Sequence, residues 1–113
     1  MAVNKYVPEK GDVIWIDFDP STGKEIQKRR PGLVVSSYSF NQSTHFAVIC
    51  PITSIIKNYP TRYNLSSTSR INGQVLISQL KSLDYIERNC EFIEKMSTNE
   101  LDQIYQLVSY IFD

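Results

Sequence analysis

The chain has 113 residues, of which 42% are hydrophobic and 21% charged, and its formal net charge is zero. This composition predicts one globular domain over residues 1–113 and excludes disordered, collagen-like and coiled-coil proteins. No stretch supplies the roughly 20 apolar residues of a membrane helix, and residues 1–12 lack a signal-peptide core, so we expect a cytoplasmic protein with no membrane partner.

Short apolar runs separated by Gly, Pro, Asn and Ser predict strands in the first part of the chain. The first covers residues 13–18, and bulky side chains on both of its faces indicate a central strand. A turn at residues 20–23 follows, and then a polar, mostly cationic loop at residues 24–30. We expect the next two strands over residues 32–37 and 45–52.

In the later part of the chain the spacing of apolar residues changes from that of strands to that of a helix. Residues 57–60 form a second loop, residues 62–66 a polar edge strand, and Asn72-Gly73 is the strongest hairpin signal. Strands are expected over residues 74–80 and 90–94. From Leu101 onward the apolar spacing is helical, with a capping box at Ser97 and Glu100. The pattern predicts a mainly β fold with a C-terminal helix, as a barrel or a sheet packed by that helix.

Charge is distributed unevenly along the chain. Residues 20–83 contain eight Lys or Arg and one acid, whereas residues 84–113 contain seven acids and two basic residues. This asymmetry favours a cationic face that binds phosphates. The alternative is ordinary solubilising charge with no such role.

Few residues suit common catalytic or metal sites. His45 is the only histidine, which excludes histidine-pair nucleases, and a structural role is favoured for it. Cys50 and Cys90 lack metal-ligand spacing, and we expect buried thiols. Asp17 and Asp19 could face one side of a strand, but capping of the following turn is favoured over metal binding.

The cationic loop and one strand end are the remaining candidates. Arg30 precedes Pro31, which restricts it to extended backbone, and its guanidinium offers a planar set of donors to a phosphate. Thr53 places a hydroxyl where the third strand reaches the surface. From these residues alone, a solvated basic loop is an equal alternative.

Several stretches, in order along nearly the whole chain, resemble the MazF-type (MazF/PemK/Kid) toxins of type II toxin–antitoxin systems. They are GDVIWIDFDP at 11–20, Gly23 and Glu25, RPGLVVS at 30–36, PIT at 51–53, Tyr59-Pro60 and QLKSLD at 79–84. The resemblance implies an SH3-like barrel of the CcdB/PemK/MazF type and a homodimer. It also implies a sequence-specific endoribonuclease (an mRNA interferase) that cleaves single-stranded RNA and thereby inhibits translation and growth.

The resemblance also implies a mechanism and partners. The ribose 2′-hydroxyl would attack the neighbouring phosphorus, leaving a 2′,3′-cyclic phosphate and a 5′-hydroxyl. No metal and no other cofactor is implied, so we expect a metal-independent enzyme. A cognate MazE-like antitoxin would cover the RNA groove, and the toxin–antitoxin complex would bind DNA.

The family's site residues carry over by position. Its catalytic arginine and threonine fall on Arg30 and Thr53, and the acid of its loop falls on Glu25, as the base or as an orienting partner of Arg30. Ile26 replaces the usual glutamine, and Lys24 stands where the Kid/PemK branch has a histidine. We therefore carry over the arginine–threonine set.

Substrate binding requires further residues. Lys24, Lys28, Arg29 and Lys81 are candidates for backbone phosphates, which position RNA without specifying its sequence. Gln79 is a candidate for reading a base edge. The competing hypothesis is a non-catalytic SH3-like binding module or a CcdB-like gyrase inhibitor, which has no special need for both Arg30 and Thr53.

Overall fold

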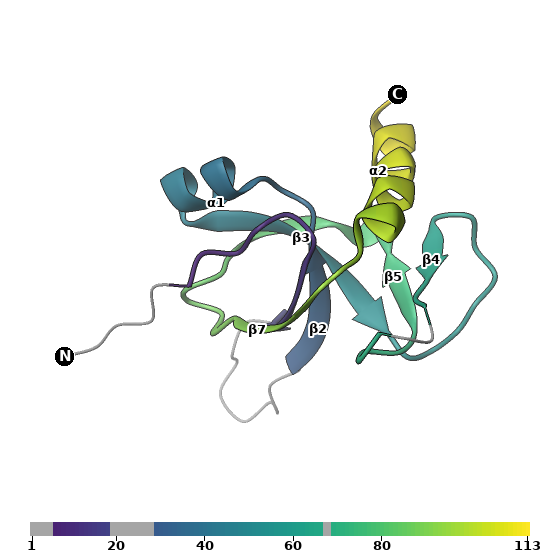
Figure 1. Ribbon diagram of the computed structural model, residues 1–113, viewed down its shortest axis with the longest axis horizontal. Helices are drawn as coiled ribbons and strands as arrows, with labels where there is room; N and C mark the ends of the chain where they lie inside the picture. The colour runs from purple at the N-terminus through teal and green to yellow at the C-terminus, as the bar shows by residue number, and fades with distance from the viewer. Residues whose placement is uncertain (1–5, 19–28, 67–68) are drawn as a thin grey trace.

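The computed structural model describes residues 6–18, 29–66 and 69–113 (Figure 1). In this part of the chain, seven strands form an antiparallel sheet in the order β4-β5-β3-β2-β1-β7, and β6 pairs with β3. The elements are β1 (Asp12–Asp17), β2 (Arg29–Val34), α1 (Tyr38–Thr44), β3 (Phe46–Thr53), β4 (Arg62–Asn64), β5 (Gln74–Leu76), the 3₁₀ helix η1 (Ile77–Gln79), β6 (Lys81–Asp84), β7 (Glu91–Lys95) and α2 (Thr98–Phe112). The expected mainly β fold with a C-terminal helix is confirmed.

Strand β3 organises the sheet because it pairs with three other strands. Its first half lies between β2 and β6, with Ile49 paired to both Val34 and Lys81. Its last two residues, Ile52 and Thr53, pair with β5 instead. The C-terminal end of β3 is therefore fixed by strands from two parts of the sheet.

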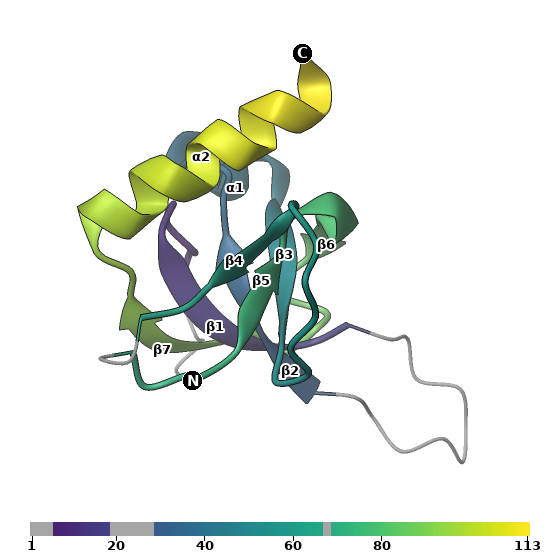
Figure 2. The same cartoon turned by 90° about the vertical axis from the view of Figure 1, so that its right-hand side faces the viewer.

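Two apolar clusters pack on opposite faces of the strands, as the alternation of side chains along each strand requires. Helix α2 lies across one face (Figure 2), where Ile104 is fully buried and Leu107 and Val108 pack on the first cluster. That cluster comprises Val13, Leu33, Val35, Cys50, Ile52, Val75, Ile77, Met96 and Ile104. The second comprises Ile14, Ile16, Phe18, Val34, Ala47, Ile49, Leu83, Tyr85 and Cys90.

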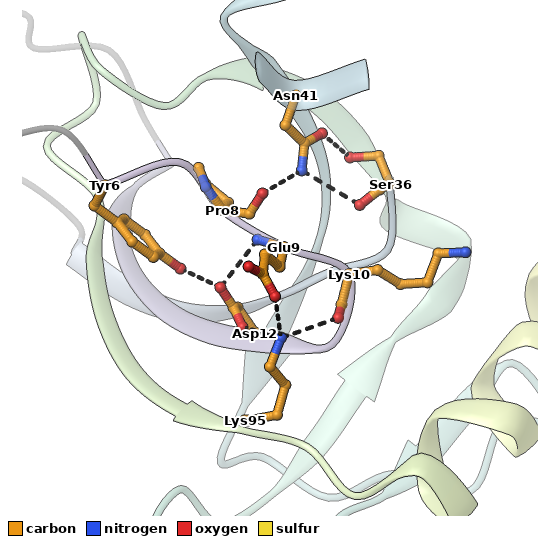
Figure 3. Close-up of polar contacts among 8 residues, drawn as sticks. All are labelled: Tyr6, Pro8, Glu9, Lys10, Asp12, Ser36, Asn41 and Lys95. Carbon is orange, nitrogen blue, oxygen red and sulfur yellow. Dashed lines mark hydrogen bonds and ion pairs between the residues drawn. The ribbon is translucent and has the colours of Figure 1, made fainter. Parts of the chain in front are cut away.

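A buried carboxylate holds the segment before β1 (Figure 3). The carboxylate of Asp12, a residue 2% exposed, accepts hydrogen bonds from the Tyr6 hydroxyl (2.5 Å) and the Glu9 backbone N–H (2.9 Å). Its other oxygen lies 2.7 Å from the Lys95 ammonium, which also binds Glu9 at 3.2 Å. Burial and the bond to Asp12 raise the pKa of Tyr6. These contacts attach the segment before β1 to Lys95 at the end of β7.

A buried amide performs a similar role at α1. The Asn41 side chain donates to the Pro8 carbonyl at 2.8 Å and accepts from the Ser36 hydroxyl at 2.5 Å (Figure 3). The Asn41 carbonyl accepts from the Tyr85 hydroxyl at 2.9 Å. Ser37 caps the helix by accepting from the Phe40 N–H. Helix α1 is therefore anchored by segments distant in sequence.

The structure differs from the sequence-based expectations at several elements. Strand β2 begins at Arg29, so Arg29 and Arg30 belong to a strand and not to the preceding loop. Helix α1 and strand β6 were not expected. The strand expected over residues 74–80 ends at Leu76, because η1 follows it directly.

The C-terminal helix and the thiols agree with expectation. Ser97 caps α2 by accepting from the Glu100 N–H, as the capping-box spacing predicted. Cys50 and Cys90 are buried and unpaired, and burial raises the pKa of the two thiols to about 12 and about 11. Among the described helices, none has both the length and the apolar character needed to cross a membrane.

Candidate functional site

Arg30 lies on β2 between two neighbouring strands. It pairs with Ile16 of β1, and on the other side β2 pairs with β3 from Gly32, opposite Pro51, onward. Its side chain is exposed and makes no hydrogen bond or ion pair with any other described residue. A guanidinium whose donors are not taken up by the described residues is suited to binding an anion.

Thr53 ends β3 and is 9% exposed. Its backbone pairs with Gln74 of β5, and its hydroxyl oxygen accepts a hydrogen bond from the Ile55 N–H at 3.1 Å. A hydroxyl has one proton to donate as well as lone pairs. The Ile55 bond uses only a lone pair, and no described residue accepts the Thr53 hydroxyl proton, which is therefore free for a ligand as far as the described residues are concerned.

The structure brings Arg30 and Thr53 to the same hollow. This hollow, of about 230 Å³, opens at the ends of β2 and β3. Its lining residues are Arg30, Pro31, Ile52, Thr53, Ser54, Ile55 and Asn72. A cation and a neutral hydroxyl donor therefore face the same small, open space.

A second hollow shares Arg30 with the first. It has a volume of about 180 Å³ and contains two further residues singled out from the sequence, Gln79 and Lys81. Its complete lining is Phe18, Arg30, Pro51, Leu76, Gln79 and Lys81. Both Gln79, at the end of η1, and Lys81, at the start of β6, are exposed. Arg30 thus stands between the two sets of candidate residues.

Arg29 has different surroundings, because neighbouring residues of a strand point to opposite faces. Its guanidinium donates to Asp17 at 3.1 Å and to Glu91 at 2.7 Å. Burial lowers the pKa of Arg29, but these two bonds outweigh it and raise the pKa overall. The bond from Asn89, followed by that from Arg29, lowers the pKa of Asp17 despite burial. Phosphate binding by Arg29 would require it to exchange these partners.

A glycine allows the close approach that holds Thr53. Gly73 has a φ of +123°, and a Cβ atom at this position would lie 2.0 Å from the Thr53 carbonyl oxygen. The Asn72-Gly73 pair was expected to form a tight hairpin, but the connection from β4 to β5 runs from residue 65 to residue 73. Gly73 serves instead to bring this connection against the end of β3.

Three of the predicted site residues, Lys24, Glu25 and Lys28, lie outside the described residues. Asp19, the second carboxylate of the weak metal hypothesis, also lies outside them. Within residues 6–18, 29–66 and 69–113, no group of three or more His, Cys, Asp and Glu side chains is arranged to hold a metal ion.

Sequence reasoning missed two residues that shape the site. Gly73 was recognised as a turn residue, but its contact with Thr53 depends on strand pairing. Gln74 is 4% exposed and binds the segment after Thr53 through its side chain. The available signal in the sequence was a glutamine at the start of an apolar strand, directly after the glycine of a turn.

Comparison with known proteins agrees with this architecture. Residues 9–112 match the family model described as PemK-like, MazF-like toxin of type II toxin–antitoxin system. The endoribonuclease toxin MazF of Escherichia coli K12 is 36% identical over 102 residues, covering 90% of this chain and 91% of that protein. The E. coli endoribonuclease PemK is 26% identical and covers 91% and 80%.

Solved structures lead to the same family. MazF in a MazE–MazF crystal structure from Deinococcus radiodurans superposes with a TM-score of 0.88 at 31% identity, covering 96% of this chain and 97% of that chain. Since the sequence match spans nearly the whole chain and the fold agrees, this protein belongs to the PemK-like, MazF-like toxins of type II toxin–antitoxin systems.

Proposed function

We propose that the protein is an endoribonuclease toxin that cleaves single-stranded mRNA at the hollow between Arg30 and Thr53. The observation that carries this proposal is the shared hollow itself, which is lined by Thr53 and by Arg30, whose guanidinium no described residue binds. The relatives that support the activity are named endoribonucleases.

The reaction needs no nucleophile from the protein. The ribose 2′-oxygen forms a bond to the adjacent phosphorus, its proton passes to a base, and the bond from phosphorus to the 5′-oxygen breaks. The leaving oxygen takes up a proton, so the products are a 2′,3′-cyclic phosphate and a 5′-hydroxyl. Holding the 2′-oxygen in line with the leaving oxygen supplies much of the rate increase.

Arg30 and Thr53 act on the charge that develops at phosphorus. The guanidinium of Arg30 stabilises the non-bridging oxygens and can also donate a proton to the leaving oxygen. Thr53 donates its hydroxyl proton to one of these oxygens. Donors fixed in advance contribute more than donors that must reorganise, and Thr53 is fixed by its bond from the Ile55 N–H and by its pairing with Gln74. Glu25 is the proposed base or the orienting partner of Arg30.

The second hollow accommodates the RNA beyond the scissile phosphate. Lys81 binds a backbone phosphate there and Gln79 reads a base edge, with Lys24 and Lys28 as further phosphate ligands. Arg29 is the weakest member of this set, because Asp17 and Glu91 already neutralise it. Counterion release makes such binding sensitive to salt.

We further propose a homodimer that acts in the cytoplasm and is neutralised by an acidic, MazE-like antitoxin. Solved relatives include MazE–MazF complexes, and a cationic RNA site would attract an acidic peptide that competes with RNA. Binding of DNA by the toxin–antitoxin complex is part of the same proposal.

The test is incubation of the purified protein with a long single-stranded RNA in EDTA. Discrete fragments with cyclic phosphate ends are expected, and sequencing of those ends gives the recognition sequence. Intact RNA would refute the proposal, and gyrase inhibition or simple RNA retention in its place would support a binding module. Cleavage that requires added Mg²⁺ or Mn²⁺ would refute the metal-independent mechanism.

A further inference from the structure

The amide of Gln74 is buried and fully occupied by hydrogen bonds. Its oxygen accepts from the Lys57 backbone N–H at 3.1 Å and from Arg62 Nη1 at 3.0 Å. Its nitrogen donates to the Lys57 carbonyl at 3.0 Å and to Asn64 Oδ1 at 2.8 Å. Gln74 therefore binds both backbone polar groups of Lys57, as a neighbouring strand would.

Arg62 adds a second tie to the same segment. Its Nη1 also donates to the Ile55 carbonyl at 2.9 Å, and its guanidinium lies 5.4 Å from the centre of the Tyr59 ring. Residues 54–60, here called the rim segment, contain no helix or strand. The rim segment is nevertheless held at Ile55, Lys57 and Tyr59 by two side chains of the β4–β5 pair.

The rim segment borders the proposed catalytic hollow. It follows Thr53 directly, and Ser54 and Ile55 line the hollow with Arg30. It also exposes three large side chains, with Ile55 63%, Ile56 61% and Tyr59 56% exposed. Neighbouring exposed apolar groups on a fixed backbone indicate a contact surface. Of the three, Tyr59 is the aromatic side chain on which an unpaired RNA base can stack, and the two isoleucines offer apolar contact beside it.

We propose that Gln74 is a positioning residue that fixes the rim segment as a base-contacting surface and so determines which RNA sites are cleaved. The inference rests on the proposed function. Gln74 touches no reacting atom in this scheme, and it acts through Lys57, Ile55 and Tyr59. Its loss should therefore alter the choice among cleavage sites as well as the rate.

Gln74→Met keeps the length of the side chain and removes all four hydrogen bonds. A shift of about 1 Å in a substrate-contacting segment can reduce the rate about 100-fold, so we expect kcat/KM at the preferred site to fall about 10- to 100-fold. Gln74→Glu keeps the two accepting interactions, but its second oxygen cannot donate to the Lys57 carbonyl or to Asn64 Oδ1, so we expect it to lose activity as well. Gln103→Met, on the exposed side of α2, is the matched control.

Two measurements separate this inference from a purely structural role. The first is hydrogen exchange at the Lys57 amide in the free protein, which should accelerate in Gln74→Met and not in Gln103→Met. The second is the relative cleavage of different sites within one long RNA, measured well below each variant's melting temperature. If Gln74→Met does not fold, Arg62→Met releases the Ile55 carbonyl and the Tyr59 ring from a less buried side chain, and the ratio of cleavage sites is its readout.

Each outcome decides the question. Faster exchange at Lys57 together with a changed ratio of cleavage sites supports the inference. Unchanged exchange would refute the tie to the rim segment, and faster exchange with an unchanged ratio of sites would refute the role in site choice. A wild-type protein that cleaves no RNA would instead overturn the proposed function and the inference that depends on it.

Discussion

Replacing Gly73 with alanine tests the contact that holds the end of β3. The added Cβ would lie 2.0 Å from the Thr53 carbonyl oxygen and 2.9 Å from its carbon, both backbone atoms that cannot rotate away. A non-glycine residue in such a conformation costs about 1–3 kcal/mol, and forced overpacking adds about 1–3 kcal/mol. We therefore expect Gly73→Ala to reduce the free energy of unfolding by about 2–6 kcal/mol.

Thermal unfolding followed by circular dichroism measures this effect. At about 4 °C per kcal/mol for a domain of this size, the melting temperature should fall by about 8–24 °C. RNA cleavage well below that temperature should fall further than the folded fraction, because relief of the clash displaces Thr53. Gly11→Ala is the matched control, since Gly11 also has a positive φ (+94°) but its nearest contact is the flexible end of Leu101.

The control separates backbone strain from displacement of the site. Gly11→Ala should lose stability and keep its cleavage rate while folded. If the free energy of unfolding of Gly73→Ala lay within about 0.5 kcal/mol of the wild-type value and the variant cleaved RNA at the same rate, the inferred close approach of Gly73 to Thr53 would be refuted. Equal loss of activity in both variants would show that the site responds to general destabilisation.

Three other predictions follow from the described contacts. Arg30→Ala should reduce the rate of RNA cleavage about 100- to 1000-fold with little change in melting temperature, and a folded, fully active Arg30→Ala protein would refute the site. Arg29→Ala should leave the salt dependence of RNA binding nearly unchanged. Asp17→Asn should be less stable than the wild type by about 1 kcal/mol at pH 7. Because folding lowers the pKa of Asp17, its contribution to the free energy of unfolding is complete above the unfolded-state pKa and disappears as the pH falls through the folded-state pKa. The urea unfolding curves of the two proteins should therefore converge in acid. Cys50 should resist alkylation at pH 8 in the native protein and react once urea unfolds it, since burial raises the pKa of the thiol to about 12; rapid native labelling would contradict the buried position.

The elements that sequence predicted well are those with local signals. The period of apolar residues after Leu101 and the Ser97 cap are properties of one short segment, and α2 agrees with both. Helix α1 has no comparable pattern, because it is stabilised by bonds from Asn41 to Pro8 and from Tyr85. The end of β5 likewise depends on the Ile77 N–H, which bonds to the Thr61 carbonyl.

The residues of the candidate site also divide into those with a local sequence signal and those that depend on contacts between distant segments. Arg30, Thr53, Gln79 and Lys81 were identified from short stretches that resemble a family, and the structure places all four around two adjoining hollows. The partners of Arg29 could not be predicted, because Glu91 reaches it only through the pairing of β1 with β7. The hydrogen bonds of Gln74 also depend on how distant segments meet.

The pairing of β1 with β7 has a consequence for synthesis of the protein. Val13 pairs with Glu94, so the ribosome adds about 80 residues between the two partners, which takes roughly 4–16 s at 5–20 residues per second. During that interval β1 has an open edge, and the apolar cluster around Val13 lacks Met96 and Ile104. The strands that carry Arg30 and Thr53 are therefore not fully supported until α2 has emerged.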